Sequence, residues 1–125
     1  MPRPYWATDP ESERSVRTSI RVCAGPSSVH PERMAEFVRT LRALLRRHGL
    51  QAAIFGHAGD CNLHCNPLMN QKDPRDLRVM EAVADEFVDL VTDLGGSLSG
   101  EHGDGRLRTP YLRRAYGPLA DVFRE

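Results

Sequence analysis

The sequence has no net charge, no long apolar run and only three cysteines, and each shortage excludes a class of protein. Its 17 basic and 17 acidic residues cancel, which leaves no positive excess for nucleic acid or an anionic membrane. No apolar run approaches the roughly 20 residues that cross a bilayer. An odd number of cysteines predicts no disulfide framework and a reducing, cytoplasmic compartment, with peripheral attachment to a membrane through a partner left open.

The length predicts one domain, because 125 residues can bury one core but not two. Residues 1–18 contain three prolines and no periodicity, and they predict a poorly ordered lead-in. The domain itself is expected over residues 19–125. The chain stops within an amphipathic segment that has no cap, so we expect a fragment of a longer protein, truncated at its C-terminus.

Two amphipathic helices are the clearest predicted elements. Residues 31–48 repeat apolar side chains at helical spacing between Pro31, which suits a first turn, and Gly49, which can end the helix. Residues 74–94 show the same spacing after Asp73, whose side chain can cap a helix N-terminus.

Short apolar stretches between these helices predict strands at residues 19–22, 52–55, 63–68 and 97–99. Residues 58–62 would form a hairpin loop, and short helices would follow from Thr109 onward. The order strand, helix, strand, strand, helix, strand predicts an α+β fold. This order of elements is typical of a ferredoxin-like βαββαβ sandwich with an antiparallel sheet, here followed by trailing C-terminal helices.

Two glycine-rich stretches hold three of the five histidines. His57 and His64 lie at the two ends of the predicted hairpin loop, within reach of one ion, and Glu101 would add a carboxylate from another strand. Two imidazoles and a carboxylate, with positions left open, are the ligands of a catalytic divalent metal. Zinc fits these ligand types best, with manganese and iron(II) as alternatives.

Two further polar residues flank the predicted ligands. His102 follows Glu101 directly, and in a regular strand their side chains would point to opposite faces. A kink at the flanking glycines would bring both to one site, where His102 could act as a base near neutral pH. Asn66 comes two residues after His64 and therefore shares its face of the strand.

Each of these residues also has a structural interpretation. A single histidine is often a satisfied structural residue, and the glycines around Asp60 and Asp104 can serve turns alone. Cys61 and Cys65 flank His64, which permits a Cys/His zinc site. We interpret the cysteines as incidental, because a structural zinc site uses two ligand pairs and the second cysteine pair is missing.

The segments FGHAGDCNLHCN and GGSLSGEHGDG, at this spacing, resemble the C-terminal (cap) domain of the FAD-linked oxidase family. That family includes D-lactate dehydrogenases, the D subunit of glycolate oxidase and D-2-hydroxyglutarate dehydrogenase. The resemblance covers residues 29–125, and its last part is closest to large members that carry iron–sulfur modules. It implies that a divalent ion is held by His57, His64 and Glu101. It also implies that His102 is the catalytic base and that Asn66 lies near the substrate.

The function implied by the resemblance is the substrate- and metal-binding cap of a flavin-dependent oxidoreductase. Such an enzyme oxidises a D-2-hydroxy acid by hydride transfer to FAD. No glycine-rich pyrophosphate loop is present, so we expect a flavin-binding domain in the same or a partner chain, and no turnover by this chain alone. The family pattern has glycine where Cys61 stands, and cysteine would cost on the order of 1 kcal/mol there if φ is positive.

Two other functions fit the same residues. The chain can be a non-catalytic metal-binding or docking module that acts with a separate flavin subunit. It can also be a small zinc hydrolase, in which His102 or Asp60 is the base for a zinc-bound water.

Overall fold

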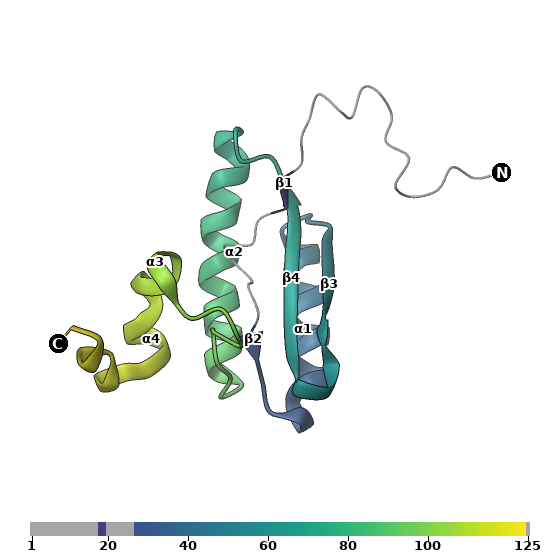
Figure 1. Ribbon diagram of the computed structural model, residues 1–125. Helices are drawn as coiled ribbons and strands as arrows, with labels where there is room; N and C mark the ends of the chain where they lie inside the picture. Colours follow the sequence, from purple (N-terminus) through teal and green to yellow (C-terminus); the bar gives the residue numbers. More distant parts are fainter. Residues whose placement is uncertain (1–17, 20–26, 125) are drawn as a thin grey trace.

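The structure is a computed structural model that describes residues 18–19 and 27–124 (Figure 1). Almost all of the predicted lead-in, and residues 20–22 of the first predicted strand, lie outside the described residues. The strands are β1 (Thr18–Ser19), β2 (Ser27–Ser28), β3 (Ala52–His57) and β4 (Asn62–Met69). The helices are η2 (Pro31–Arg33), α1 (Met34–Arg47), η3 (Ala58–Asp60), α2 (Pro74–Asp93), α3 (Gly105–Arg108), η4 (Thr109–Tyr111), α4 (Leu112–Tyr116) and η5 (Gly117–Arg124).

The strands form an antiparallel sheet in which β4 is central. Along one edge β4 pairs with β3, which places Phe55 opposite His64 and His57 opposite Asn62. The short strands β1 and β2 also pair with β4, β1 near Met69 and β2 near Asn62. Because β2 and β3 contact the same residues of β4, they lie on its opposite edges.

In place of the predicted strand at residues 97–99, the structure has a single β-bridge between Ser28 and Ser97. Ser28 and Ser97 exchange two backbone hydrogen bonds, of 3.0 and 2.8 Å. The sheet order is therefore Ser97, β1 and β2, β4, β3, which confirms the predicted α+β fold with the ferredoxin-like order. The prediction of a strand over 97–99 is wrong in length. The side chain of Ser97 bonds to both backbone groups of Ser99, at 3.0 and 3.2 Å, and turns the chain away from the sheet.

Both long helices begin and end close to the residues that the sequence predicts. Asp73 caps α2 through Oδ1, which accepts from the backbone N–H of Arg75 at 2.8 Å, and Pro74 opens the first turn. The turn after α1 contains Gly49 at φ +65°, a conformation that glycine adopts without steric cost. In the described part of the chain, no helix combines the length and the apolar character that crossing a membrane requires.

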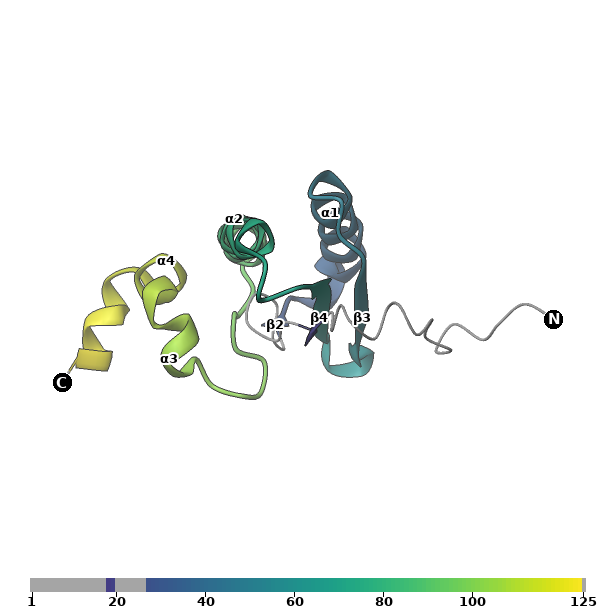
Figure 2. The same ribbon diagram turned by 90° about the horizontal axis from the view of Figure 1, so that it is seen from above.

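Helices α1 and α2 cover one face of the sheet, and among the described residues no helix covers the other (Figure 2). The core between helices and sheet includes Val29, Phe37, Leu41, Leu45, Cys65, Phe87, Val88, Val91, Leu94 and Leu98. Burial alternates along β4, where Cys65, Pro67 and Met69 face the helices. The residues that alternate with them, His64, Asn66 and Leu68, face the open side.

The C-terminal helices pack beside α2 rather than on the sheet (Figures 1 and 2). Helical structure begins at Gly105, four residues before the predicted start at Thr109. Pro110 has no backbone N–H to donate, and the segment is correspondingly divided into short α and 3-10 pieces.

One carboxylate joins the two long helices. Glu86 of α2 accepts hydrogen bonds from Nε2 of His48, at 2.7 Å, and from the guanidinium of Arg47. These partners, His48 first and then Arg47, hold the pKa of Glu86 below its usual 4.5.

We expect Glu86→Gln to lower the free energy of unfolding by less than about 1 kcal/mol at neutral pH, because water screens this half-exposed carboxylate. The folded state has the depressed pKa, so the stabilisation is present above about pH 4.5 and is lost as the pH falls through the folded-state pKa. Urea unfolding at several pH values measures the effect, with Glu81→Gln on the exposed side of α2 as control. A difference between wild type and Glu86→Gln that persists in strong acid would contradict this account.

Candidate metal centre

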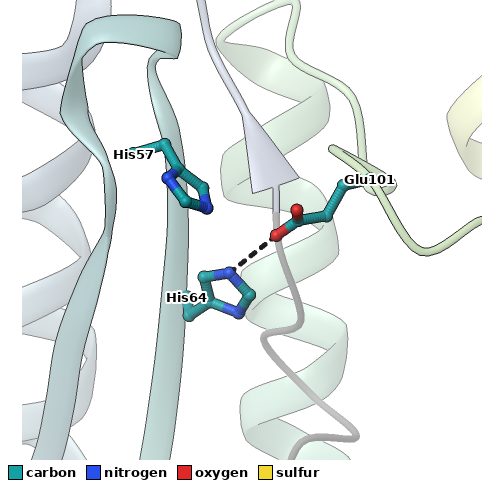
Figure 3. Close-up of side chains that lie close together, drawn as sticks. All are labelled: His57, His64 and Glu101. Atoms are coloured by element: carbon teal, nitrogen blue, oxygen red, sulfur yellow. Dashed lines mark hydrogen bonds and ion pairs between the residues drawn. The ribbon is translucent and has the colours of Figure 1, made fainter.

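His57 and His64 project from the β3–β4 hairpin toward one point (Figure 3). His57 is exposed, and the side chain of His64 is 17% exposed. The hairpin brings them together because β3 and β4 approach closely at Gly56, which has φ +151°. A Cβ on Gly56 would lie 2.3 Å from the carbonyl oxygen of Asn62, so the site requires glycine here.

Glu101 reaches the same point from the segment that follows the Ser97 bridge (Figure 3). Its Oε1 lies 2.9 Å from Nε2 of His64, a hydrogen-bond distance. This segment packs tightly on the hairpin, since a Cβ on Gly100 would lie 2.3 Å from Oδ1 of Asn62. Its backbone bends at Gly100 and Glu101 instead of continuing as a strand. Because the segment bends here, Glu101 and His102 need not point to opposite faces, as they would in a regular strand.

The three side chains offer a suitable set of ligands for a metal. One ligand atom from each of His57, His64 and Glu101 lies within 4.8 Å of the other two. Ligand atoms around a tetrahedral zinc ion are about 3.4 Å apart, so a small contraction would close the group around an ion. Within the described part of the chain, Glu101 pairs with histidines and not with arginine, so its charge is available to a cation.

His102 lies beside this cluster. Its Nε2 is 4.0 Å from Oε1 of Glu101, and its ring centroid is 5.9 Å from that of His64. The side chain is 58% exposed, so a small molecule on the open face can reach it. A neutral imidazole in this position can accept a proton from such a molecule.

The open face beside the cluster carries an aromatic ring and an amide. Phe55 stacks on His64 with ring centroids 5.0 Å apart and an interplanar angle of 2°. This stack restrains the plane of the imidazole. Asn66 lies next along β4 on the same face, opposite Ala53. Sequence reasoning did not single out Phe55, although its position two residues before His57 places both on one face of a strand.

A second polar group, also missed from the sequence, lies where the glycine-rich segment meets the C-terminal helices. Asp104 accepts a hydrogen bond from the hydroxyl of Tyr116 through Oδ2, at 3.1 Å. Burial and the charge of Asp104 raise the pKa of Tyr116, so its hydroxyl keeps the proton that it donates. Arg108 donates to the carbonyl oxygen of Gly103 at 2.9 Å, and burial lowers the pKa of Arg108. No local pattern predicts this contact between Asp104 and Tyr116, which are 12 residues apart.

The two described cysteines lie outside the cluster. Cys65 faces the helices, on the side of β4 opposite to His64. Cys61 is buried at φ +52°, the left-handed conformation in which a cysteine costs on the order of 1 kcal/mol. Among the described residues, the group that could hold a metal contains two histidines and a glutamate and no thiol.

Comparison with known proteins identifies the family to which this chain belongs. The family model described as FAD linked oxidases, C-terminal domain, matches residues 18–125. The chain belongs to this family, which confirms the resemblance seen in the two glycine-rich segments.

The curated relatives that this chain matches include two dehydrogenases and an oxidase subunit. The chain is 37% identical over 93 residues to D-2-hydroxyglutarate dehydrogenase of Pseudomonas putida. It is 35% identical over 88 residues to glycolate oxidase subunit GlcD of Bacillus subtilis and 34% identical over 92 residues to D-lactate dehydrogenase of Anaerostipes hadrus. These alignments cover 74%, 69% and 73% of this chain. They cover only 9%, 18% and 19% of the respective relatives.

Proposed function

We propose that this chain is the substrate- and metal-binding cap of a flavin-dependent oxidoreductase that oxidises a D-2-hydroxy acid by hydride transfer to FAD. The flavin-binding domain lies in the same or a partner chain. FAD bound there would supply the acceptor for the hydride that leaves C2 of the substrate. His57, His64 and Glu101 would hold a divalent cation, with zinc preferred, and this ion would supply Lewis-acid polarisation of substrate oxygens.

Residues of this chain accept the substrate proton, bind the substrate and orient the ring of His64. His102 accepts the proton of the substrate hydroxyl at Nε2, so that the alcohol loses one proton and one hydride and becomes a carbonyl. Asn66 donates from its amide to the substrate, which lies over the open face of the sheet. Phe55 holds the ring of His64 and keeps water from one side of it.

One observation carries this proposal. Two imidazoles and a carboxylate converge within 4.8 Å, and a third imidazole stands 4.0 Å from that carboxylate on the face that no described helix covers. A purely structural zinc site would be closed by a fourth protein ligand. An open cluster beside a potential base instead suits a metal that binds substrate, and the relatives' names supply the substrate class.

The test is anaerobic reduction of FAD in the complete flavoprotein that contains this chain, loaded with zinc and mixed with a panel of 2-hydroxy acids. We expect D-enantiomers to bleach the flavin absorbance and L-enantiomers not to. Treatment with a chelator should slow the bleaching, and added zinc should restore it.

Three results would contradict the proposal. No bleaching by any D-2-hydroxy acid in the zinc-loaded protein would exclude the oxidation. Bleaching at the same rate when this chain is left out would make it a docking module. Metal-dependent hydrolysis of esters or phosphoesters by the chain alone would indicate the zinc hydrolase instead.

A further inference from the structure

Glu101 and His102 are neighbours in a segment that has no regular secondary structure. Residues 98–104 contain bends and no helix or strand, so no continuous backbone ladder fixes these two side chains. At its start the segment is held by the bridge between Ser28 and Ser97 and by the contact of Gly100 with Asn62. The geometry of the cluster of His57, His64 and Glu101 therefore depends on what holds the other end of this segment.

The other end is held through Asp104. Its Oδ2 accepts from the Tyr116 hydroxyl at 3.1 Å, while its Oδ1 is buried without a hydrogen-bond partner among the described residues. Tyr116 therefore provides the hydrogen bond that compensates this carboxylate for lost water. Removing that donor would leave the Asp104 carboxylate without its described hydrogen bond. This end of the segment, which Arg108 also holds through the carbonyl oxygen of Gly103, would then loosen.

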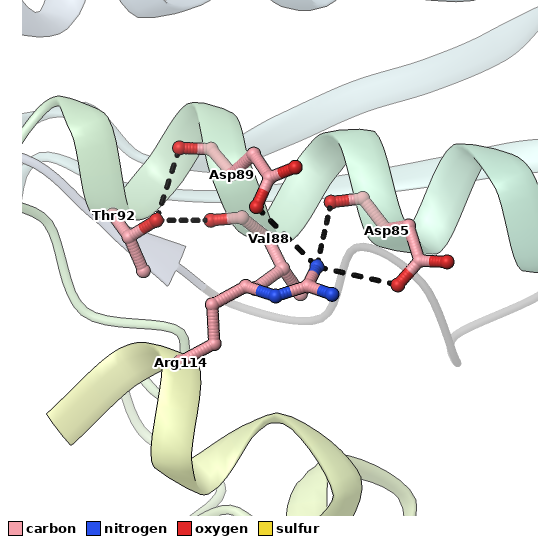
Figure 4. A network of polar contacts seen from close by, with 5 residues as sticks. All are labelled: Asp85, Val88, Asp89, Thr92 and Arg114. Atoms are coloured by element: carbon pink, nitrogen blue, oxygen red, sulfur yellow. Dashed lines mark hydrogen bonds and ion pairs between the residues drawn. The ribbon is translucent and has the colours of Figure 1, made fainter. Parts of the chain in front are cut away.

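Tyr116 is itself fixed to the body of the domain. It ends α4, and Arg114 of the same helix binds α2 through three contacts (Figure 4). The Nη1 of Arg114 lies 3.2 Å from Oδ1 of Asp85, 3.3 Å from the carbonyl oxygen of Asp85 and 3.3 Å from Oδ1 of Asp89. Its guanidinium also lies 5.7 Å from the ring centre of Tyr111. A continuous set of contacts thus runs from α2 through α4 to the segment that carries Glu101.

We infer that Tyr116 and Asp104 are positioning residues, which hold Glu101 and His102 against the histidines of the hairpin. This inference rests on the proposed function, because it assigns the pair to the same metal and base. Neither residue is one of the three candidate ligands, so we expect their effect on metal binding to pass through Glu101. A role limited to general stability would not depend on whether Glu101 is present.

The test measures zinc affinity of the 125-residue chain by calorimetry, with cobalt absorption as a second probe. We expect Tyr116→Phe, which removes only the hydroxyl, to weaken zinc binding about 10-fold. This is the lower end of the loss when a metal ligand's own hydrogen-bond partner is removed, because Tyr116 acts on Glu101 indirectly, through Asp104. In a Glu101→Gln background the same change should have no further effect. Asp104→Asn keeps an acceptor for the hydroxyl and should weaken binding less than Tyr116→Phe. Arg113→Gln, which breaks the ion pair between Arg113 of α4 and Asp121 of η5, is the matched control and should leave the zinc affinity unchanged.

A loss from Tyr116→Phe that is equal with and without Glu101, or no loss at all, would overturn the inference. Hydrogen exchange of the metal-free chain gives a second readout that does not need a metal. The Tyr116→Phe variant should exchange the amides of residues 100–104 faster, with α1 and α2 unchanged. If wild type binds no zinc, the proposed metal site fails, and this exchange alone decides the positioning role, with unchanged exchange rejecting it.

Discussion

Replacing Glu101 by glutamine is expected to lower the zinc affinity of this chain by more than about 100-fold, because even the outer partners of metal ligands contribute about 10- to 100-fold. Glutamine has nearly the same shape but carries no charge, so the change removes one ligand while leaving the bend in place. It also removes the anion that offsets the charge of the ion. Titration with zinc against a chelator of known affinity measures the loss.

Two comparisons make this result specific. His30→Gln alters an exposed histidine far along the chain from the cluster and should leave zinc affinity unchanged. His57→Gln and His64→Gln should each weaken binding as strongly as Glu101→Gln. Cobalt absorption bands from sulfur ligation would contradict the assignment, since they would place the metal on the cysteines.

Replacing His102 by glutamine is expected to slow flavin reduction in the complete flavoprotein by about 100- to 10,000-fold, the usual contribution of a general base. Glutamine can still form hydrogen bonds but cannot take a proton from the substrate hydroxyl. Stopped-flow absorbance of the flavin with a D-2-hydroxy acid measures the effect.

The metal provides the control for this second prediction. His102 lies outside the group of ligands, so zinc affinity of His102→Gln should match that of wild type within experimental error. A variant that keeps most of the wild-type rate would remove the role of base from His102. Equal loss of zinc and of activity would make His102 a ligand instead.

The helices and the hairpin were predictable because their signals are local. Asp73 followed by Pro74 is typical of a helix start, and the structure shows the cap. The hairpin follows from two apolar runs around a short glycine-rich loop, and its pairing brings His57 and His64 together. The candidate ligands on the hairpin therefore came from sequence spacing alone.

The rest of the candidate site depends on contacts that no local pattern encodes. The sequence leaves open whether Glu101 and His102 share a face, because that depends on a bend set by Gly100 packing against Asn62. The pairing of Asp104 with Tyr116 requires the C-terminal helices to fold back beside α2. Side chains that compete with backbone pairing, as at Ser97, shorten the last strand in a way that hydrophobic patterns cannot show.

The candidate ligands come from two pieces of chain, since Glu101 lies 37 residues beyond His64. An ion shared between them would act as a reversible cross-link that closes a large ring of polypeptide. An ion that binds only the folded chain raises its melting temperature by mass action. The melting temperature of this domain would then rise with the free zinc concentration. Removal of zinc would lower the stability of the fold as well as any activity that depends on the ion.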